Sequence, residues 1–483
     1  MSYNSIHKLL ILLAAVAVCG CIPLYAQDEL EIVSYNTFGG GNSLECFDHI
    51  QTSDGGYLLV GNGGFEGKWY DMFAVKTDEN GDSLWTRNYG GAYPIGESCY
   101  KVIETENGYL LIGSQREFRG DQNALIIKIN DNGDSLWSNI YGGEGGEIFN
   151  TALKLENGYI FAGMTTSWGN GGGDMWLLRT DENCESLWSR TYGGSGVEEC
   201  NDMILDSYNR YILGGYFCDE LNPRPSVLLV FTNEEGDSLN RYWHGVGESE
   251  CCLSVNQLNL NIFTIAGRMY YANESTSQIL TIAIDTEGHR VWGRLDGIRE
   301  EYIANSCLSS VVTSNRNLME CVKIDDDSLG LIKLNTQGEI IFEQNFLLDG
   351  TISGNSILQN PYGSYSISGT VYNDIQGFFQ LITSPDPDFE NSVIHDRQLK
   401  YELLSLSSYG GRLVFQIPCT GITTARVYIC DIMGRQVFRE IFDTKPHQTN
   451  QILINISDYP SGMYLLRINT DNSTKTGEFV ILK

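Results

Sequence analysis

The stretch TDENGDSLWTRNYGG, from Thr77 to Gly91, recurs along the chain. Its copies are INDNGDSLWSNIYGG from Ile129, TDENCESLWSRTYGG from Thr180 and the more divergent TNEEGDSLNRYWHGV from Thr232. A fixed period of about 50 residues indicates a repeat architecture, in which each unit buries its apolar face against its neighbours. The periodic tryptophans are therefore expected to pack between units; they are Trp85, Trp137, Trp188 and Trp292.

Each repeat reads as four short strands. In one copy, apolar runs at 100–105, 109–112 and 124–129 precede a fourth around Trp137, and Asn-Gly or Gly-rich turns separate them. Runs of about five β-branched and aromatic residues joined by such turns are typical of antiparallel hairpins. Four antiparallel strands in each unit predict a blade of a β-propeller. The Asn80-Gly81 turn is expected to be type I′.

Counting the units predicts seven blades. The first five begin after Phe38, Tyr89, Tyr141, Tyr192 and Trp243, and two degenerate units follow. The seventh unit lacks a fourth strand, whereas residues 31–36 form an orphan strand ahead of the first blade. We expect this segment to pair with residues 378–382 and close the ring, which removes two open sheet edges. The predicted fold is all-β: a seven-bladed propeller closed by an N-terminal strand.

Charge narrows the choice of ligand. The chain of 483 residues carries 31 Lys and Arg against 61 Asp and Glu, a net charge of −30. Such a surface repels phosphate backbones and anionic headgroups, so nucleic acid is not expected as a partner. Neutral and cationic ligands remain open.

Residues 1–26 read as an export signal: a charge at Lys8, an apolar run at 9–18, and Leu24-Tyr25-Ala26 before the expected cleavage site. The run is too short to span a bilayer as a helix, so no transmembrane segment is expected after cleavage. The alternative makes Cys21 a lipid-modified N-terminus. Small buried cysteines in repeat strands are favoured over a disulfide framework or a metal site.

Two resemblances extend this interpretation. Asp54-Gly55-Gly56-Tyr57 and the Tyr-Gly-Gly triplets resemble those of bacterial secreted propeller-repeat proteins. Residues 399–483 resemble the C-terminal sorting domain of type IX secretion in its type A form. The matching positions are Asp431, Gly434, Arg435, Gly462 and Tyr464. The resemblance implies a small β-sandwich, recognition by the type IX secretion machinery, and a secreted or outer-membrane surface location.

The expected organisation is thus a signal peptide at 1–26, a propeller at 27–385, a linker at 386–398 and the sorting domain at 399–483. We expect a monomer. Whether the protein is attached to the surface or released stays open at this point.

The variable loops between second and third strands are the expected binding surface, because loops on a rigid ring are where binding is normally built. Aromatic side chains in polar loops suit sugar rings or peptide surfaces. The alternative is that half of them only cover the loop base. The candidates are Trp69, Tyr70, Phe118, Trp168, Phe217, Tyr270 and Tyr271.

A second candidate is a ring of carboxylates near the channel mouth, each just before the first strand of a blade. Its members are Glu45, Glu97, Glu147, Glu199 and Glu250. Several oxygen ligands would suit Ca²⁺. The alternative is that each carboxylate braces an adjacent Gly-Gly turn, and repetition favours this alternative. Apart from this Ca²⁺, no cofactor is expected.

No catalytic motif stands out: the mature histidines occupy unrelated repeat positions, and no Gly-x-Ser-x-Gly elbow occurs. The favoured hypothesis is a non-enzymatic, exported propeller that binds a glycan or a protein. The alternative is a secreted polysaccharide hydrolase or lyase that uses carboxylates at the channel mouth.

Overall fold

The computed structural model describes residues 29–386 and seven strands of the C-terminal region. The gaps within 29–386 are 40–41, 65–69, 92–94, 118–119, 220–222, 246–248, 271–276, 297–305, 325–326, 362 and 373–375. The predicted signal peptide, its Cys21 alternative and nearly all of the predicted linker lie outside the described residues.

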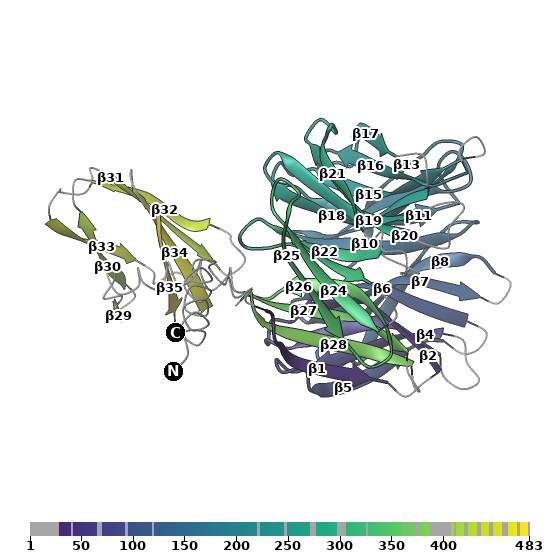
Figure 1. The fold of residues 1–483 in the computed structure, drawn as a ribbon, viewed down its shortest axis with the longest axis horizontal. Coiled ribbons are helices and arrows are strands. Elements are labelled where there is room, and N and C mark those ends of the chain that lie inside the picture. The colour runs from purple at the N-terminus through teal and green to yellow at the C-terminus, as the bar shows by residue number, and fades with distance from the viewer. Residues whose placement is uncertain are drawn as a thin grey trace, which may run out of the picture. The chain divides into compact units, whose positions relative to one another are not determined.

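Residues up to Asp386 form seven four-stranded antiparallel sheets arranged as a propeller (Figure 1). Blade 1 consists of β2 (Asn42–Gln51), β3 (Tyr57–Gly64), β4 (Tyr70–Thr77) and β5 (Ser83–Tyr89). Blade 2 consists of β6 (Ile95–Thr105), β7 (Gly108–Glu117), β8 (Gln122–Ile129) and β9 (Ser135–Tyr141). Blade 3 consists of β10 (Glu147–Leu155), β11 (Gly158–Thr165), β12 (Asp174–Thr180) and β13 (Ser186–Tyr192). Blade 4 consists of β14 (Val197–Leu205), β15 (Tyr211–Cys218), β16 (Ser226–Thr232) and β17 (Ser238–His244). Blade 5 consists of β18 (Ser249–Asn259), β19 (Ile262–Tyr270), β20 (Ser277–Asp285) and β21 (Arg290–Asp296). Blade 6 consists of β22 (Ser306–Val312), β23 (Leu318–Lys323), β24 (Ser328–Leu334) and β25 (Ile340–Leu347). Blade 7 consists of β26 (Thr351–Gln359), β27 (Ser364–Tyr372), β28 (Gln376–Pro385) and the N-terminal strand β1 (Ile32–Phe38).

The seventh blade closes the ring as predicted. Strand β1 pairs antiparallel with β28, with Tyr35 opposite Leu381 and Phe38 opposite Phe378. Leu30, just ahead of β1, exchanges two 2.7 Å backbone hydrogen bonds with the side-chain amide of Gln344 in blade 6. The predictions of seven blades and of N-terminal closure are therefore confirmed.

Apolar packing runs between neighbouring blades. Seven buried clusters join adjacent blades in turn, one for each junction of the ring. The innermost strands pack side by side around the channel. Each of them shifts register at the same place, which leaves one unpaired residue; these are Phe47, Tyr100, Asn150, Asn201, Leu253, Leu308 and Asn355. Where that residue is Asn150 or Asn201, its amide bonds to a backbone carbonyl of the next blade.

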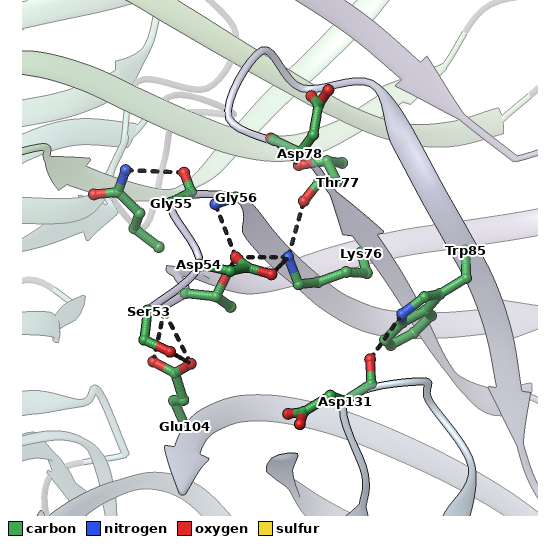
Figure 2. A network of polar contacts seen from close by, with 12 residues as sticks. Ser53, Asp54, Gly55, Gly56, Lys76, Thr77, Asp78, Trp85, Glu104 and Asp131 are labelled. Atoms are coloured by element: carbon green, nitrogen blue, oxygen red, sulfur yellow. Dashed lines mark hydrogen bonds and ion pairs between the residues drawn. The ribbon is translucent and has the colours of Figure 1, made fainter. Parts of the chain in front are cut away.

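The Asp-Gly-Gly turn at 54–56 connects blade 1 to blade 2 (Figure 2). Lys76 on β4 bonds to the Asp54 carboxylate at 3.0 Å, and that carboxylate also accepts the Gly56 amide at 2.9 Å. In the same turn, Ser53 donates from its amide and its hydroxyl to Glu104 of blade 2. The Asp-Gly-Gly turn is therefore fixed both within its blade and against its neighbour.

The Asn-Gly turn is not type I′, which would require positive φ at both central residues. Gly81 has φ +87°, but Asn80 is not among the residues with positive φ. The Gly81 amide donates to the Asp78 carbonyl at 3.1 Å, and the register shifts between Lys76 and Thr77. The turn is therefore a type I turn followed by a glycine bulge, because one extra residue separates the strands.

The cysteines follow the favoured interpretation. The eight cysteines whose side chains the structure describes are free thiols, and six of them are buried. The described part of the chain contains no helix with the length and apolarity needed to cross a bilayer.

The chain divides between Asp386 and Pro387 into two compact units. The second unit has two antiparallel sheets, ordered β29-β30-β33 and β32-β31-β34-β35. Their strands are β29 (Ser407–Tyr409), β30 (Arg412–Cys419), β31 (Thr424–Asp431), β32 (Gln436–Asp443), β33 (Gln448–Asn455), β34 (Gly462–Thr470) and β35 (Thr474–Ile481). Asp431 pairs with Tyr464, and Gly462 pairs with Ile481, whereas Gly434 and Arg435 lie outside the described residues. The sandwich packing of the two sheets stays a prediction.

Candidate functional site

A pocket of about 550 Å³ opens at the junction of blades 3 and 4. It combines glycine-rich backbone with aromatic, hydroxyl and charged side chains. The lining residues are Gly193, Gly194, Ser195, Glu198, Phe217, Asp219, Ser226, Leu228, Arg241 and Trp243. Gly193 to Ser195 belong to the connection between the blades, and Asp219 lies in the loop between β15 and β16. The pocket therefore lies on the face where the sequence predicted binding.

Blade 4 supplies the floor of the pocket through cross-strand neighbours. Glu198 on β14 stands opposite Phe217 on β15, which stands opposite Ser226 on β16. Leu228 on β16 stands opposite Trp243 on β17. Because side chains alternate along a strand, residues paired in this way lie on one face of the sheet. Leu228 and Phe217 also belong to the apolar packing between blades 3 and 4.

Two pocket residues depart from the repeat. The position of Arg241 is held by Thr86, Ser138 and Ser189 in blades 1 to 3. The guanidinium of Arg241 donates to the Gly193 carbonyl at 3.3 Å, and among the described residues no carboxylate forms an ion pair with it. Its remaining N–H groups are therefore available to a ligand.

Trp243 is the second departure. Blades 1 to 3 have Asn88, Ile140 and Thr191 at its position. The side chain is 58% exposed. A large indole at an exposed position that most blades fill with a smaller side chain indicates a role in contact with a ligand.

Beneath the pocket, two carboxyl groups meet beside Gly193. Asp174 begins β12, and its Oδ2 accepts the Asn170 amide at 2.9 Å; Glu198 Oε1 accepts the Gly194 amide at 3.2 Å. The other oxygens, Asp174 Oδ1 and Glu198 Oε2, are buried without a hydrogen-bond partner. Both lie within 2.5 Å of the point where a Cβ on Gly193 would stand, so glycine is required there.

The surroundings raise the pKa of both acids. For Asp174 the main cause is burial, opposed by the Asn170 amide and by Arg241. For Glu198 the main cause is also burial, and the charges of Asp174 and Asp219 raise its pKa further, against the Gly194 amide and Arg241. The pair therefore resists carrying two negative charges.

The predicted loop aromatics are spread around the ring. Phe217 lines the pocket. Tyr70, Trp168 and Tyr270 are exposed in blades 1, 3 and 5. Trp168 packs on Trp176, with ring centroids 5.5 Å apart, and Tyr270 lies under the Arg268 guanidinium. Trp69, Phe118 and Tyr271 lie outside the described residues. The described candidates therefore form no single cluster.

The five predicted carboxylates are not brought together. Glu97 and Glu147 accept backbone amides of Gly91 and Gly143, at 2.7 and 2.9 Å, which is the bracing role. Glu250 is buried at the matching position of blade 5. In the described ranges, no group of three or more His, Cys, Asp or Glu is placed to hold a metal ion.

Glu45 and Glu199 fall one residue later in the strand register than the bracing set. Glu199 accepts bonds from Asn150 and Tyr216, both at 2.8 Å, and the residue that braces blade 4 is Glu198. In blade 1 the bracing position is held by Leu44. The predicted ring thus differs from the structure because adjacent strand residues face opposite sides.

Sequence reasoning missed Asp174, Glu198, Arg241 and Trp243. For Arg241 and Trp243 the signal was a departure from the repeat: Asn240-Arg241 stands where the first three copies have Trp-Thr or Trp-Ser. Asp174 and Glu198 follow the repeat, so no such signal marked them.

The C-terminal residues 412–482 match a family model described as a secretion system C-terminal sorting domain. The chain therefore carries a type IX sorting domain and is exported to the cell surface or the extracellular space. The resemblance of the propeller repeats to a Tyr-Gly-Gly repeat family remains an expectation.

Several solved structures match the chain at low identity and low TM-score. PorZ of Porphyromonas gingivalis, a surface component of its type IX secretion system, is 9% identical with a TM-score of 0.36, over 89% of this chain and 69% of that one. A protein of unknown function from Dyadobacter fermentans is 11% identical with a TM-score of 0.46, over 74% and 100%. Trypanosoma rangeli sialidase is 9% identical with a TM-score of 0.36, over 95% and 88%. A comparison with curated proteins finds no match.

Proposed function

We propose that this exported protein binds a neutral glycan in the pocket between blades 3 and 4 and releases it unchanged. The observation that carries the proposal is the departure of blade 4 from the repeat. Arg241 and Trp243 replace the smaller residues of blades 1 to 3 at two positions that line one pocket. Residues common to all blades build the scaffold, so residues special to one blade are candidates for recognition.

The chemistry of the lining favours a sugar. Trp243 and Phe217 offer apolar ring faces, and Ser195, Ser226 and Arg241 offer hydrogen-bonding groups. Such a mixture, in a pocket of 300–1,000 Å³, is typical of small-molecule sites. A neutral ligand is favoured over an anionic one, because the chain has a net charge of −30 and Glu198 and Asp219 also line the pocket.

The carboxyl pair argues against the alternative of a hydrolase. Glycosidases place two carboxyl groups on either side of the scissile bond, about 5–9.5 Å apart. Here the free oxygens of Asp174 and Glu198 both lie within 2.5 Å of one point, the Cβ position of Gly193, and both side chains are buried. A sugar linkage does not fit between groups that are so close.

The test uses the full chain on a panel of neutral and acidic oligosaccharides, with calorimetry on each binder and a reducing-sugar assay. Arg241→Ser and Trp243→Thr, which restore the residues of blade 3, are expected to weaken binding at least tenfold. Ile140→Thr is the control, since Ile140 holds the position of Trp243 in blade 2 and is similarly exposed. Sugar release, binding unaffected by the two pocket variants, or binding to proteins alone would contradict the proposal.

A further inference from the structure

The free oxygens of Asp174 and Glu198 belong to two acidic groups that are buried close together. Asp174 is 2% exposed and Glu198 is 3% exposed, and Oδ1 of one and Oε2 of the other lack any donor. Because both oxygens lie within 2.5 Å of the Cβ position of Gly193, two ionised carboxylates would repel strongly in this buried site. Something must therefore neutralise one of them.

The described surroundings supply no second donor. The charged groups that face the pair are Arg241 from β17 and Asp219 from the loop after β15. Arg241 gives its hydrogen bond to the Gly193 carbonyl, and Asp219 adds negative charge. Two carboxylates are also too few ligands for a hard cation, and among the described residues no third acidic, cysteine or histidine ligand converges on them.

We infer that Asp174 and Glu198 share one proton, held between Oδ1 and Oε2, and that this acid pair is a pH-sensitive element beneath the pocket. A protonated carboxyl group donates where a carboxylate only accepts, so one proton satisfies both free oxygens. The pair then carries a single negative charge, which the nearby Arg241 balances. Its raised pKa values have the direction that proton sharing requires.

Blade 2 contains an internal comparison. There Asn123 holds the place of Asp174, and Asn123 Oδ1 and Glu147 Oε2 lie within 2.7 Å of the Cβ point of Gly142. Because the amide is neutral, only one carboxylate stands at this point and no pair of like charges forms. Asp174→Asn therefore gives the junction of blades 3 and 4 a residue pair that the chain already folds around.

The inference rests on the proposed function in one respect: the pair regulates the proposed ligand site. Glu198 lines the pocket, and its other oxygen holds the Gly194 amide in the pocket wall. Loss of the proton adds a second negative charge beside Arg241 and drives the two carboxylates apart. We expect the wall formed by Gly193 to Ser195 to shift as the pH rises through this change.

The test needs no ligand, so its failure is distinct from failure of the proposed function. Infrared spectra of the full chain, recorded in pH steps upward from 4.5, are compared between wild type and Asp174→Asn, because a protonated carboxyl group absorbs apart from a carboxylate. We expect wild type to show a protonated-carboxyl band that disappears on raising the pH and is lost in Asp174→Asn. Glu198→Gln, as a second variant, should lose the same band if Asp174→Asn does not fold.

Asp206→Asn is the control. Asp206 is buried like the pair, but its carboxylate accepts the Tyr208 and Arg210 amides at 2.9 and 2.8 Å and pairs with the Arg210 guanidinium. This variant should keep the wild-type band. A band that persists in both pair variants, or a wild-type spectrum without one, would overturn the inference.

Discussion

The indole of Trp85 lies against Gly133 of the next blade, and its Nε1 donates a 3.1 Å hydrogen bond to the Asp131 carbonyl. Tyr89, four residues later, donates to the Gly133 carbonyl at 2.8 Å. Trp188 and Trp292 face Gly236 and Gly338 in the same way. The Trp and Tyr of one repeat thus clamp the turn of the next, which explains why these residues recur together.

Replacing Gly133 with alanine should destabilise the propeller. Gly133 has φ +80°, and an added Cβ would stand 3.0 Å from the Trp85 ring. Backbone strain and overpacking together are expected to lower the free energy of unfolding by about 2–4 kcal/mol. Gly55→Ala is the control: φ is +88° there, but its Cβ would meet only the Glu79 side chain, at 4.0 Å, so about 1 kcal/mol is expected. Denaturant titrations would measure both variants. If the two lost the same free energy of unfolding, the contact between the Trp85 ring and Gly133 would not be a source of stability.

The end of the propeller depends on a buried ion pair. The Lys333 ammonium lies 2.8 and 2.6 Å from the two carboxylate oxygens of Asp386, and the Tyr365 hydroxyl also donates to that carboxylate. Because Asp386→Ala leaves Lys333 buried without its partner, we expect a loss of about 3–5 kcal/mol in the free energy of unfolding. Lys333→Met combined with Asp386→Ala should recover most of it. A double variant as unstable as the single one would contradict this account.

The blades were predictable because their signals are local and repeated. The turn glycines, the tryptophan period and the orphan strand at 31–36 each fix a strand position, and the closure on β28 follows from strand counting. The turn type was not predictable from Asn80-Gly81 alone, since one extra residue in the loop decides between type I′ and a bulge.

The site was less predictable, for a physical reason. Glu198 and Glu199 are adjacent in sequence, yet strand alternation sends one to Gly194 and the other to Tyr216. A one-residue misalignment therefore exchanges a pocket residue for a channel residue. Asp174 and Glu198 meet only because two blades pack at Gly193, and no local pattern records that meeting.

Export should depend on the sorting domain. Deletion of residues 399–483, which include the matched segment 412–482, is expected to leave the propeller in the periplasm. Immunoblots of surface, periplasmic and culture fractions would show the change. Arg241→Ser in the intact chain is the control, since it alters the pocket and not the sorting signal. Normal surface display of the truncated chain would contradict the assignment.

His49 should make the propeller sensitive to acid. Its two ring nitrogens lie 3.0 Å from the hydroxyls of Ser366 and Ser368, and burial lowers its pKa from 6.5 to about 3. The unfolded chain therefore binds more protons than the folded one below pH 6.5. The free energy of unfolding should fall by about 1.4 kcal/mol per pH unit from pH 6.5 toward 3. His49→Gln should remove this slope, whereas His289→Gln, at an exposed histidine, should preserve it.

The acid pair predicts the opposite dependence on pH. The pKa values of Asp174 and Glu198 are raised above 3.8 and 4.5, so the folded chain holds a proton that the unfolded chain has released. Their contribution to the free energy of unfolding is thus complete below these values and is lost as the pH rises through the raised pKa.

The free energy of unfolding is measured against pH for wild type and for Asp174→Asn, and the difference isolates the contribution of the pair, because the His49 contribution is common to both. We expect wild type to lose stability relative to Asp174→Asn as the pH rises above 4.5, and the difference to level off once the pair has ionised. Urea titrations at half-unit pH steps would measure it. A difference that is flat across this range would mean that the folded chain holds no extra proton at Asp174, and the inference of a shared proton would then fail.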